Sequence, residues 1–170
     1  MSSTSSTGGL VRAVIAFGAN LGDREHTITE SLRALAAADG IELVAISPLY
    51  ESAALKPAGV DHSAPAYLNG VALVDTTLDA HALLERLAGI EAQFGRVRET
   101  HWGDRTIDLD LIDFGGQHIA DAVLEVPHPR AWQRAFVLRP WLDVDPTAVI
   151  PGRGAVAQLA AEASDEVTRR

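Results

Sequence analysis

The order of the apolar segments is the sequence feature that most constrains the fold of this chain. Segments with the apolar pattern of a buried strand alternate with segments that have a helical apolar period, in the order βαββαβ. Their bounds are Val11–Phe17, Asp23–Gly40, Glu42–Tyr50, Tyr67–Val74, Asp79–Phe94 and Ile107–Phe114. This order predicts an α/β (α+β) fold of the ferredoxin-like kind, with a mainly antiparallel sheet and helices packed on one face.

Polar loops and a C-terminal region complete the expected fold. The loops run over Glu51–Ala66 and Arg96–Thr106, and long loops of this kind in a compact domain are often functional. After Gly115 we expect extra elements, namely a strand or two around Ile119–Val126 and a helix near Val156–Ala163.

Length, charge and cysteine content limit what the chain can do. Its 170 residues suit one domain, which we place at residues 10–170 after a disordered tail at residues 1–9. A net charge of −9 argues against a surface that binds nucleic acid. The sequence has no cysteine and no apolar run of about 18 residues, so we expect no disulfide, no membrane span and a cytoplasmic location.

The acidic pair Asp108 and Asp110 is the sharpest local feature. On a strand these side chains point to the same face, roughly 6.6 Å apart, whereas Leu109 and Leu111 point into the core. Carboxylates so placed repel each other unless cations lie between them, and Mg²⁺ prefers such oxygen ligands. The alternative is an ordinary solvent-facing strand edge that happens to carry acids.

Arginines and a tryptophan precede this acidic strand. Arg96 and Arg98 follow the predicted helix, and Arg105 lies just before Asp108. They could serve only the helix dipole or a salt bridge, but arginine in such a loop also suits phosphate. Trp102 in the same polar loop is suited to stacking on a planar ring. The pattern favours a magnesium and phosphate centre that acts on a nucleotide.

Further candidates have plain structural alternatives. Glu91, at the edge of a helical apolar stripe, is either a boundary residue or one that reaches into the site. His128 lies in a proline-flanked turn, where histidines are often structural. Tyr67 and Phe136 could be core aromatics, whereas Asn69 is less expected on an apolar strand because a buried amide needs partners.

Taken together, these motifs resemble one family of enzymes. The chain resembles 6-hydroxymethyl-7,8-dihydropterin pyrophosphokinases over about Val11 to Pro151. The matching segments, in the family's order, are FGANLGD, SPLYES, YLNGVAL, IEAQFGRVR, WGDRTIDLDLI and VPHPRAWQRAFVLRPW. The resemblance implies an ATP-dependent diphosphokinase of folate biosynthesis, a transferase of phosphorus-containing groups. Such an enzyme moves pyrophosphate from ATP to 6-hydroxymethyl-7,8-dihydropterin and releases AMP.

The resemblance also implies roles for individual residues. Asp108 and Asp110 would hold two Mg²⁺ ions. The residues expected to be catalytic are Arg96, Arg98, Arg105, Asp108 and Asp110. Those expected at ATP are Glu91, Arg98, Trp102, Arg105, Leu111, His128 and Arg134. Those expected at the pterin are Ser52, Leu55, Tyr67, Asn69, Trp102 and Phe136. The family further implies a monomer with ATP and the pterin as its partners.

Two other classes of function remain open from the sequence. One is a metal-dependent phosphohydrolase or nucleotidyltransferase on the same fold, which would need no pterin acceptor. The other is a non-catalytic ferredoxin-like ligand-binding module, which would need neither Asp108 nor Asp110.

Overall fold

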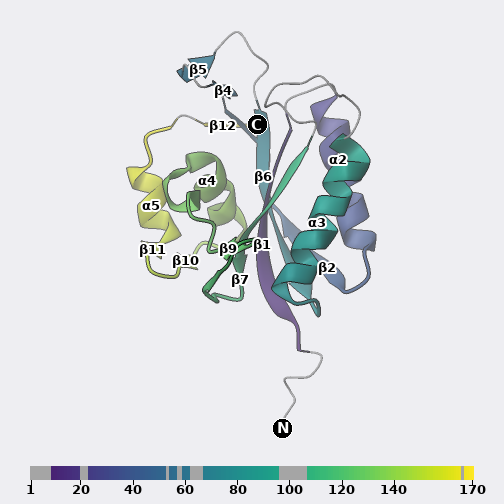
Figure 1. The fold of residues 1–170 in the computed structure, drawn as a ribbon. Coiled ribbons are helices and arrows are strands. Elements are labelled where there is room, and N and C mark those ends of the chain that lie inside the picture. Colours follow the sequence, from purple (N-terminus) through teal and green to yellow (C-terminus); the bar gives the residue numbers. More distant parts are fainter. Residues whose placement is uncertain are drawn as a thin grey trace.

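The computed structural model describes residues 9–19, 23–52, 54–56, 59–61, 67–95, 107–165 and 167–170. Their main feature is one six-stranded sheet (Figure 1). Its strands are β1 (Val11–Ala19), β2 (Ile41–Ile46), β3 (Tyr50–Ser52), β6 (Tyr67–Thr76), β7 (Asp108–Phe114) and β12 (Thr168–Arg169). The order is β12-β3-β6-β1-β7, with β2 also paired to β6, and every pairing is antiparallel. The mixed α/β class and the mainly antiparallel sheet are therefore confirmed, whereas the ferredoxin-like assignment stays a prediction.

Helices cover both faces of this sheet: the two helices of the predicted βαββαβ core lie on one face, as expected, and C-terminal helices cover the other face, which the sequence did not predict. One face carries α2 (Arg24–Ala37) and α3 (Ala80–Gly95), and the other carries α4 (Ala135–Val144) and α5 (Val156–Glu162) (Figure 1). A short 3-10 helix, η1 (Ala131–Gln133), precedes α4. Small two-stranded pairs complete the described elements: β4 (Ala54–Lys56) with β5 (Gly59–Asp61), β8 (Ile119–Ala120) with β9 (Glu125–Val126), and β10 (Val149–Ile150) with β11 (Gly154–Ala155).

The two faces have separate apolar cores because side chains alternate along each strand. The first core joins α2 and α3 to β-strand residues such as Ile15, Phe17 and Leu109. The second joins α4 and α5 to the alternate strand positions, among them Val14 and Val71. Each central strand therefore packs against α2 and α3 with one face and against α4 and α5 with the other.

The predicted helices begin and end close to where the sequence placed them. The Asp23 carboxylate caps α2 by accepting a hydrogen bond from the His26 amide at 3.1 Å. In α3, Leu83 and Leu87 are almost fully buried, as their spacing predicted. The expected C-terminal helix is confirmed as α5, and the expected strands around Ile119–Val126 are confirmed as β8 and β9.

The predicted strand Glu42–Tyr50 is divided into β2 and β3 at Ser47 and Pro48. Pro48 has no amide hydrogen to pair with a neighbouring strand. The Ser47 amide donates to the carbonyl of Val71 at 2.9 Å, and its hydroxyl accepts from the Val71 amide at 2.9 Å. The side chain thus replaces a backbone acceptor at the break, and both halves continue to pair with β6.

The segment expected to be one loop, Glu51–Ala66, contains parts of β3 and both strands of the β4–β5 pair. Most of the predicted tail at residues 1–9 and the whole of the predicted loop Arg96–Thr106 lie outside the described residues. Within the described ranges, no helix combines the length and the apolarity that crossing a bilayer requires.

Helix α4 was not expected from the sequence, and it closes one side of the site described below. Its Val137, Leu138 and Trp141 side chains are almost fully buried against the sheet. Pro140 lies inside the helix, where it removes one backbone hydrogen bond, so a sequence pattern containing it does not suggest a helix. Near the other end of α4, the Tyr50 hydroxyl donates to the Asp143 carboxylate at 2.5 Å and ties the helix to β3. Burial, and then the hydrogen bond to Asp143, raise the pKa of Tyr50 to about 12.

Candidate active site

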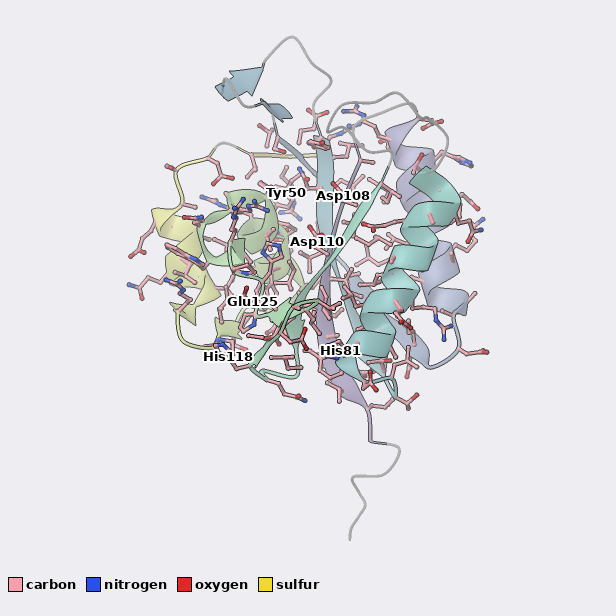
Figure 2. All side chains as sticks on the ribbon, in the orientation of Figure 1. Tyr50, His81, Asp108, Asp110, His118 and Glu125 are labelled. Carbon is pink, nitrogen blue, oxygen red and sulfur yellow. The ribbon has the colours of Figure 1, made fainter. Side chains whose placement is uncertain are left out.

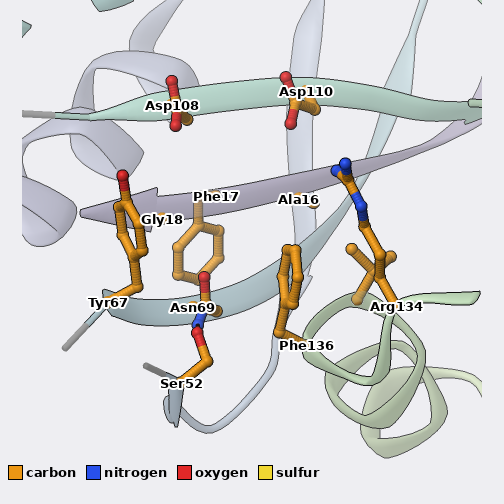
Figure 3. A pocket seen from close by; sticks show the side chains of 11 residues that line it. Ala16, Phe17, Gly18, Ser52, Tyr67, Asn69, Asp108, Asp110, Arg134 and Phe136 are labelled. Atoms are coloured by element: carbon orange, nitrogen blue, oxygen red, sulfur yellow. Dashed lines mark hydrogen bonds between the residues drawn. The ribbon is translucent and has the colours of Figure 1, made fainter. Parts of the chain in front are cut away.

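A pocket opens on the α4 face of the sheet, where β1 ends and where β6 and β7 begin (Figure 3). Its cavity volume is about 220 Å³. Side chains of the sheet and of the first turn of α4 surround it. The lining residues are Ala16, Phe17, Gly18, Ser52, Tyr67, Asn69, Asp108, Asp110, Arg134, Phe136 and Val137.

The two acids of β7 face this pocket together. Asp108 and Asp110 lie on the same side of the strand (Figures 2 and 3). Leu109 and Leu111 are each only 4% exposed and belong to the core on the opposite side. The predicted alternation is thus confirmed, and it results from the two-residue repeat of the strand.

Glu91 of α3 fixes the backbone of this acidic strand. Its carboxylate accepts a hydrogen bond from the Leu109 amide at 2.7 Å. Leu109 lies between Asp108 and Asp110, so the bond restrains the strand at the point where those side chains project into the pocket. Glu91 is not among the residues that line the pocket, so its predicted reach into the site stays a prediction.

The carboxylates fit a Mg²⁺ site that substrate oxygens complete. Mg²⁺ in proteins is commonly held by one or two carboxylates together with substrate phosphates and water. Among the residues that the structure describes, no group of three or more His, Asp and Glu side chains could hold a metal ion. Asp108 and Asp110 would therefore need phosphate or water oxygens as further ligands.

The opposite side of the pocket combines aromatic rings with an amide. Tyr67 and Phe136 line the cavity with Asn69 between them (Figure 3). Asn69 is only 5% exposed, and its amide nitrogen donates to the Ser52 hydroxyl at 2.8 Å. This is the partner that a buried amide requires. With the nitrogen engaged by Ser52, the amide oxygen is left as the group that can accept a hydrogen bond from a ligand.

Gly18 leaves the space that the Asn69 amide occupies. A Cβ atom at Gly18 would lie 3.0 Å from the Asn69 amide oxygen, which is closer than ordinary van der Waals contact. Ala16 and Gly18 face the pocket because they lie two residues apart on β1. Neither residue was expected at the site from the sequence. The two-residue repeat of β1, which places them on the same face as Val14, is the signal that could have indicated their position.

Arg134 supplies positive charge next to the acids. It lines the pocket at the start of α4, and its guanidinium carbon is 5.5 Å from the centre of the Phe136 ring. Burial lowers the pKa of Arg134, and the neighbouring Arg130 lowers it further, whereas Asp110 opposes this shift. Arginine remains charged near neutral pH, so this side chain is suited to an anionic ligand.

His128 is held in a fixed orientation near Asp110. Its ring Nδ1 accepts a hydrogen bond from the Arg130 amide at 3.1 Å, and its own amide donates to the carbonyl of Ile112 at 2.8 Å. Burial lowers the pKa of His128, although the charge of Asp110 acts in the opposite direction. The neutral ring therefore carries its proton on Nε2, which is the nitrogen left to donate to a ligand.

The remaining predicted site residues are placed only in part. Leu111 points into the core, so a nucleotide contact at this position would have to come from its backbone. Leu55 lies on β4, opposite Val60 of β5. The predicted positions Arg96, Arg98, Trp102 and Arg105 lie outside the described residues.

The sequence is similar to a defined family of enzymes. Residues 14–146 match the family described as 7,8-dihydro-6-hydroxymethylpterin-pyrophosphokinase (HPPK). A 2-amino-4-hydroxy-6-hydroxymethyldihydropteridine pyrophosphokinase of Pseudomonas aeruginosa is 42% identical over 151 residues, which cover 88% of this chain and 91% of the relative. The enzyme of the same description in Methylorubrum extorquens is 39% identical over 153 residues, which cover 88% and 94%. A mitochondrial folate synthesis bifunctional protein of Pisum sativum is 40% identical over 136 residues, which cover 80% of this chain and 25% of the relative.

Solved structures share the fold. An HPPK-DHPS protein in complex with substrates has a TM-score of 0.71 at 14% identity, with 91% of this chain covered. A Plasmodium falciparum HPPK-DHPS variant with SDX-DHP also has a TM-score of 0.71, at 15% identity and 93% coverage. The chain spans 43% and 46% of the length of these solved chains, so the likeness concerns one part of larger proteins.

Proposed function

The chain belongs to the 7,8-dihydro-6-hydroxymethylpterin-pyrophosphokinase family, and from this premise we propose that it transfers pyrophosphate from ATP to 6-hydroxymethyl-7,8-dihydropterin. It is thus an ATP-dependent diphosphokinase of folate biosynthesis. The products are AMP and the pterin diphosphate. The observation that carries the proposal is the placement of Asp108 and Asp110 across one pocket from an aromatic pair and a buried amide.

The acidic side of the pocket is the proposed phosphate side. Carboxylates alone would repel a triphosphate, so cations are required between them and the nucleotide. We propose that Asp108 and Asp110 hold two Mg²⁺ ions, which when bound would offset charge on the transferring phosphoryl groups. Glu91 would keep both carboxylates in place through its bond to the Leu109 amide.

Cationic and hydrogen-bonding side chains would complete this side. Arg134 would contact phosphate, and His128 would donate from Nε2 to the nucleotide. We retain Arg96, Arg98, Trp102 and Arg105 as proposed contacts on the strength of the sequence motif in which they occur. Arginines from that segment would neutralise charge that develops on the leaving AMP, a role in which positioned donors are effective.

The aromatic side is the proposed acceptor side. Tyr67 and Phe136 would enclose the flat pterin ring, and the Asn69 oxygen would accept from a ring N–H group. Ser52, Leu55 and Trp102 are the further pterin contacts that we propose. The hydroxymethyl oxygen would then attack the β-phosphorus of ATP, and the bond from that phosphorus to the α,β-bridging oxygen would break. Holding both substrates in line is the main contribution of the protein to such a transfer.

The decisive experiment follows both products of one reaction. Purified protein is incubated with ATP, Mg²⁺ and 6-hydroxymethyl-7,8-dihydropterin, and nucleotides and pterins are separated by chromatography. We expect AMP and pterin diphosphate in equal amounts, and no turnover after Mg²⁺ is chelated. Release of ADP or inorganic phosphate, or nucleotide cleavage without the pterin, would favour the phosphohydrolase or nucleotidyltransferase class instead. Binding without any turnover would favour a non-catalytic module.

We further propose a monomer in the cytoplasm, as the sequence predicts. Analytical ultracentrifugation at micromolar concentration would test the oligomeric state directly.

A further inference from the structure

The described residues of the C-terminal segment 165–170 contact two elements that border the pocket, α4 and β3. The segment follows α5, its Asp165 bonds the first residue of α4, and its β12 pairs with β3. Its described residues are Asp165 and residues 167–170. Neither the sequence motifs nor the proposed catalytic steps give this segment a role.

Asp165 caps the helix that carries one side of the pocket. Both of its carboxylate oxygens lie 2.9 Å from the amide nitrogen of Ala135, the first residue of α4. The residue at the usual capping position, Arg134, makes no side-chain capping bond. The helix therefore receives its cap from a distant part of the chain. A carboxylate at this end is also favoured by the helix dipole.

The capped residue lies directly between two pocket side chains. Ala135 is 1% exposed, and its neighbours Arg134 and Phe136 both line the cavity. The direction of those side chains depends on the backbone of this first turn. Because the first amides of a helix have no partner within it, the turn frays readily when its cap is lost.

The same segment also extends β3. Thr168 of β12 pairs with Glu51 of β3, and the Arg170 amide donates to the carbonyl of Leu49 at 2.8 Å. The Arg170 guanidinium also contacts the carboxylate of Glu51 at 3.1 Å. Strand β3 ends at Ser52, whose hydroxyl accepts from the Asn69 amide.

We propose that Asp165 and residues 167–170 hold α4 and β3 in register around the pocket, and that Asp165 is a positioning residue for Arg134 and Phe136. This inference rests on the proposed assignment of the pocket to the pterin and the phosphates. Asp165 touches neither substrate. It acts through the Ala135 amide, which determines where the flanking side chains lie.

The test compares three variants of the full-length enzyme. Asp165→Ala removes the cap, Asp165→Asn keeps one acceptor oxygen, and Asp145→Ala is the control. Asp145 also bonds a nearby amide, that of Thr147 at 3.3 Å, but it lies at the far end of α4. The KM for 6-hydroxymethyl-7,8-dihydropterin, kcat and Tm are measured for each, together with hydrogen exchange at the Ala135 amide by NMR.

We expect Asp165→Ala to speed exchange at Ala135 and to raise the pterin KM by roughly fivefold, the effect of losing a typical cap. Asp165→Asn should recover most of the loss, and Asp145→Ala should leave the KM unchanged. A Tm close to that of the parent enzyme would separate positioning from general instability. If Asp165→Ala folds poorly, the positioning role is tested with Asp165→Asn instead. Because asparagine keeps part of the cap, we expect a small increase in both the exchange rate at Ala135 and the pterin KM.

Tyr67→Ala distinguishes a failure of this inference from a failure of the pocket assignment. If Tyr67→Ala raises the pterin KM and Asp165→Ala leaves it and the exchange rate unchanged, the positioning role is wrong while the pocket stands. If neither variant changes the pterin KM, the pocket does not bind the pterin, and the inference is overturned with it.

Discussion

A methyl group at Gly18 should weaken binding of the pterin while sparing ATP. In Gly18→Ala the new Cβ would lie 3.0 Å from the Asn69 amide oxygen and 3.6 Å from the backbone oxygen of Leu68. The backbone of a central strand cannot move easily, so the amide must shift by a few tenths of an ångström. That shift lengthens its 2.8 Å bond to the Ser52 hydroxyl and misdirects the oxygen offered to the ligand.

The magnitude follows from the bond at risk. A neutral hydrogen bond contributes about 0.5–1.5 kcal/mol, so the dissociation constant for the pterin should rise by roughly two- to tenfold. Because the perturbed group is the end of one side chain, the Tm should change by only about 2 °C or less. Isothermal titration calorimetry with the pterin and, separately, with a non-hydrolysable ATP analogue gives both affinities.

The matched control adds the same methyl group elsewhere. A Cβ atom at Gly89 in α3 would meet no atom within 4 Å, so Gly89→Ala should leave both affinities unchanged. Ser52→Ala should weaken pterin binding through the same amide, and the double variant with Gly18→Ala should lose less than the sum of the two. Unaltered pterin affinity in Gly18→Ala, or an equal loss for ATP, would show that the Asn69 amide does not direct the pterin.

Three other outcomes test the metal site, a buried charge and the packing of the sheet. Asp110→Asn should retain the fold by circular dichroism but lose roughly 100-fold or more in kcat, since a metal-ligand charge is removed; normal turnover would exclude a metal role for this residue. Burial raises the pKa of Asp113, so its ionisation destabilises the native state as pH rises through and above the ordinary carboxyl range. In urea titrations, the unfolding free energy of Asp113→Asn should therefore rise relative to that of the parent between about pH 4 and about pH 7. A difference between the two that does not change with pH would contradict this. A Cβ at Gly70 would lie 2.6 Å from Cε1 of the buried Phe17 ring, so Gly70→Ala should lose about 1–3 kcal/mol of unfolding free energy. The surface-facing Gly89→Ala change in α3 should instead gain up to about 1 kcal/mol, and a Gly70→Ala variant as stable as the parent would mean that the ring relaxes without cost.

The central part of the site was predictable because it depends on local periodicity. The two-residue repeat of a strand requires Asp108 and Asp110 to share a face and Leu109 to oppose it, whatever the rest of the chain does. The helical stripe of α3 was predictable for the same reason. Asn69 could be recognised because an amide on an apolar strand needs a partner, although the sequence did not identify Ser52 as that partner.

The other side of the pocket depends on contacts between distant segments, which periodicity does not reveal. Helix α4 contains Pro140 and receives its cap from Asp165, 30 residues further along the chain. Neither feature resembles the usual start or interior of a helix. The two-sided arrangement of helices was therefore missed, and with it the reason why Arg134 and Phe136 face the sheet.

The division of each central strand between two faces has a consequence for how such an enzyme can diversify. Positions such as Ala16, Gly18 and Asn69 line the pocket, whereas immediate neighbours in sequence, such as Ile15 and Leu68, are buried in the core on the opposite face. Residues under selection for catalysis and residues under selection for folding are thus adjacent in the gene but separated by the thickness of a sheet. Changes in ligand preference can accumulate at every second codon of these strands at little expense to thermostability, whereas a single-residue insertion between them would exchange the two sets at once.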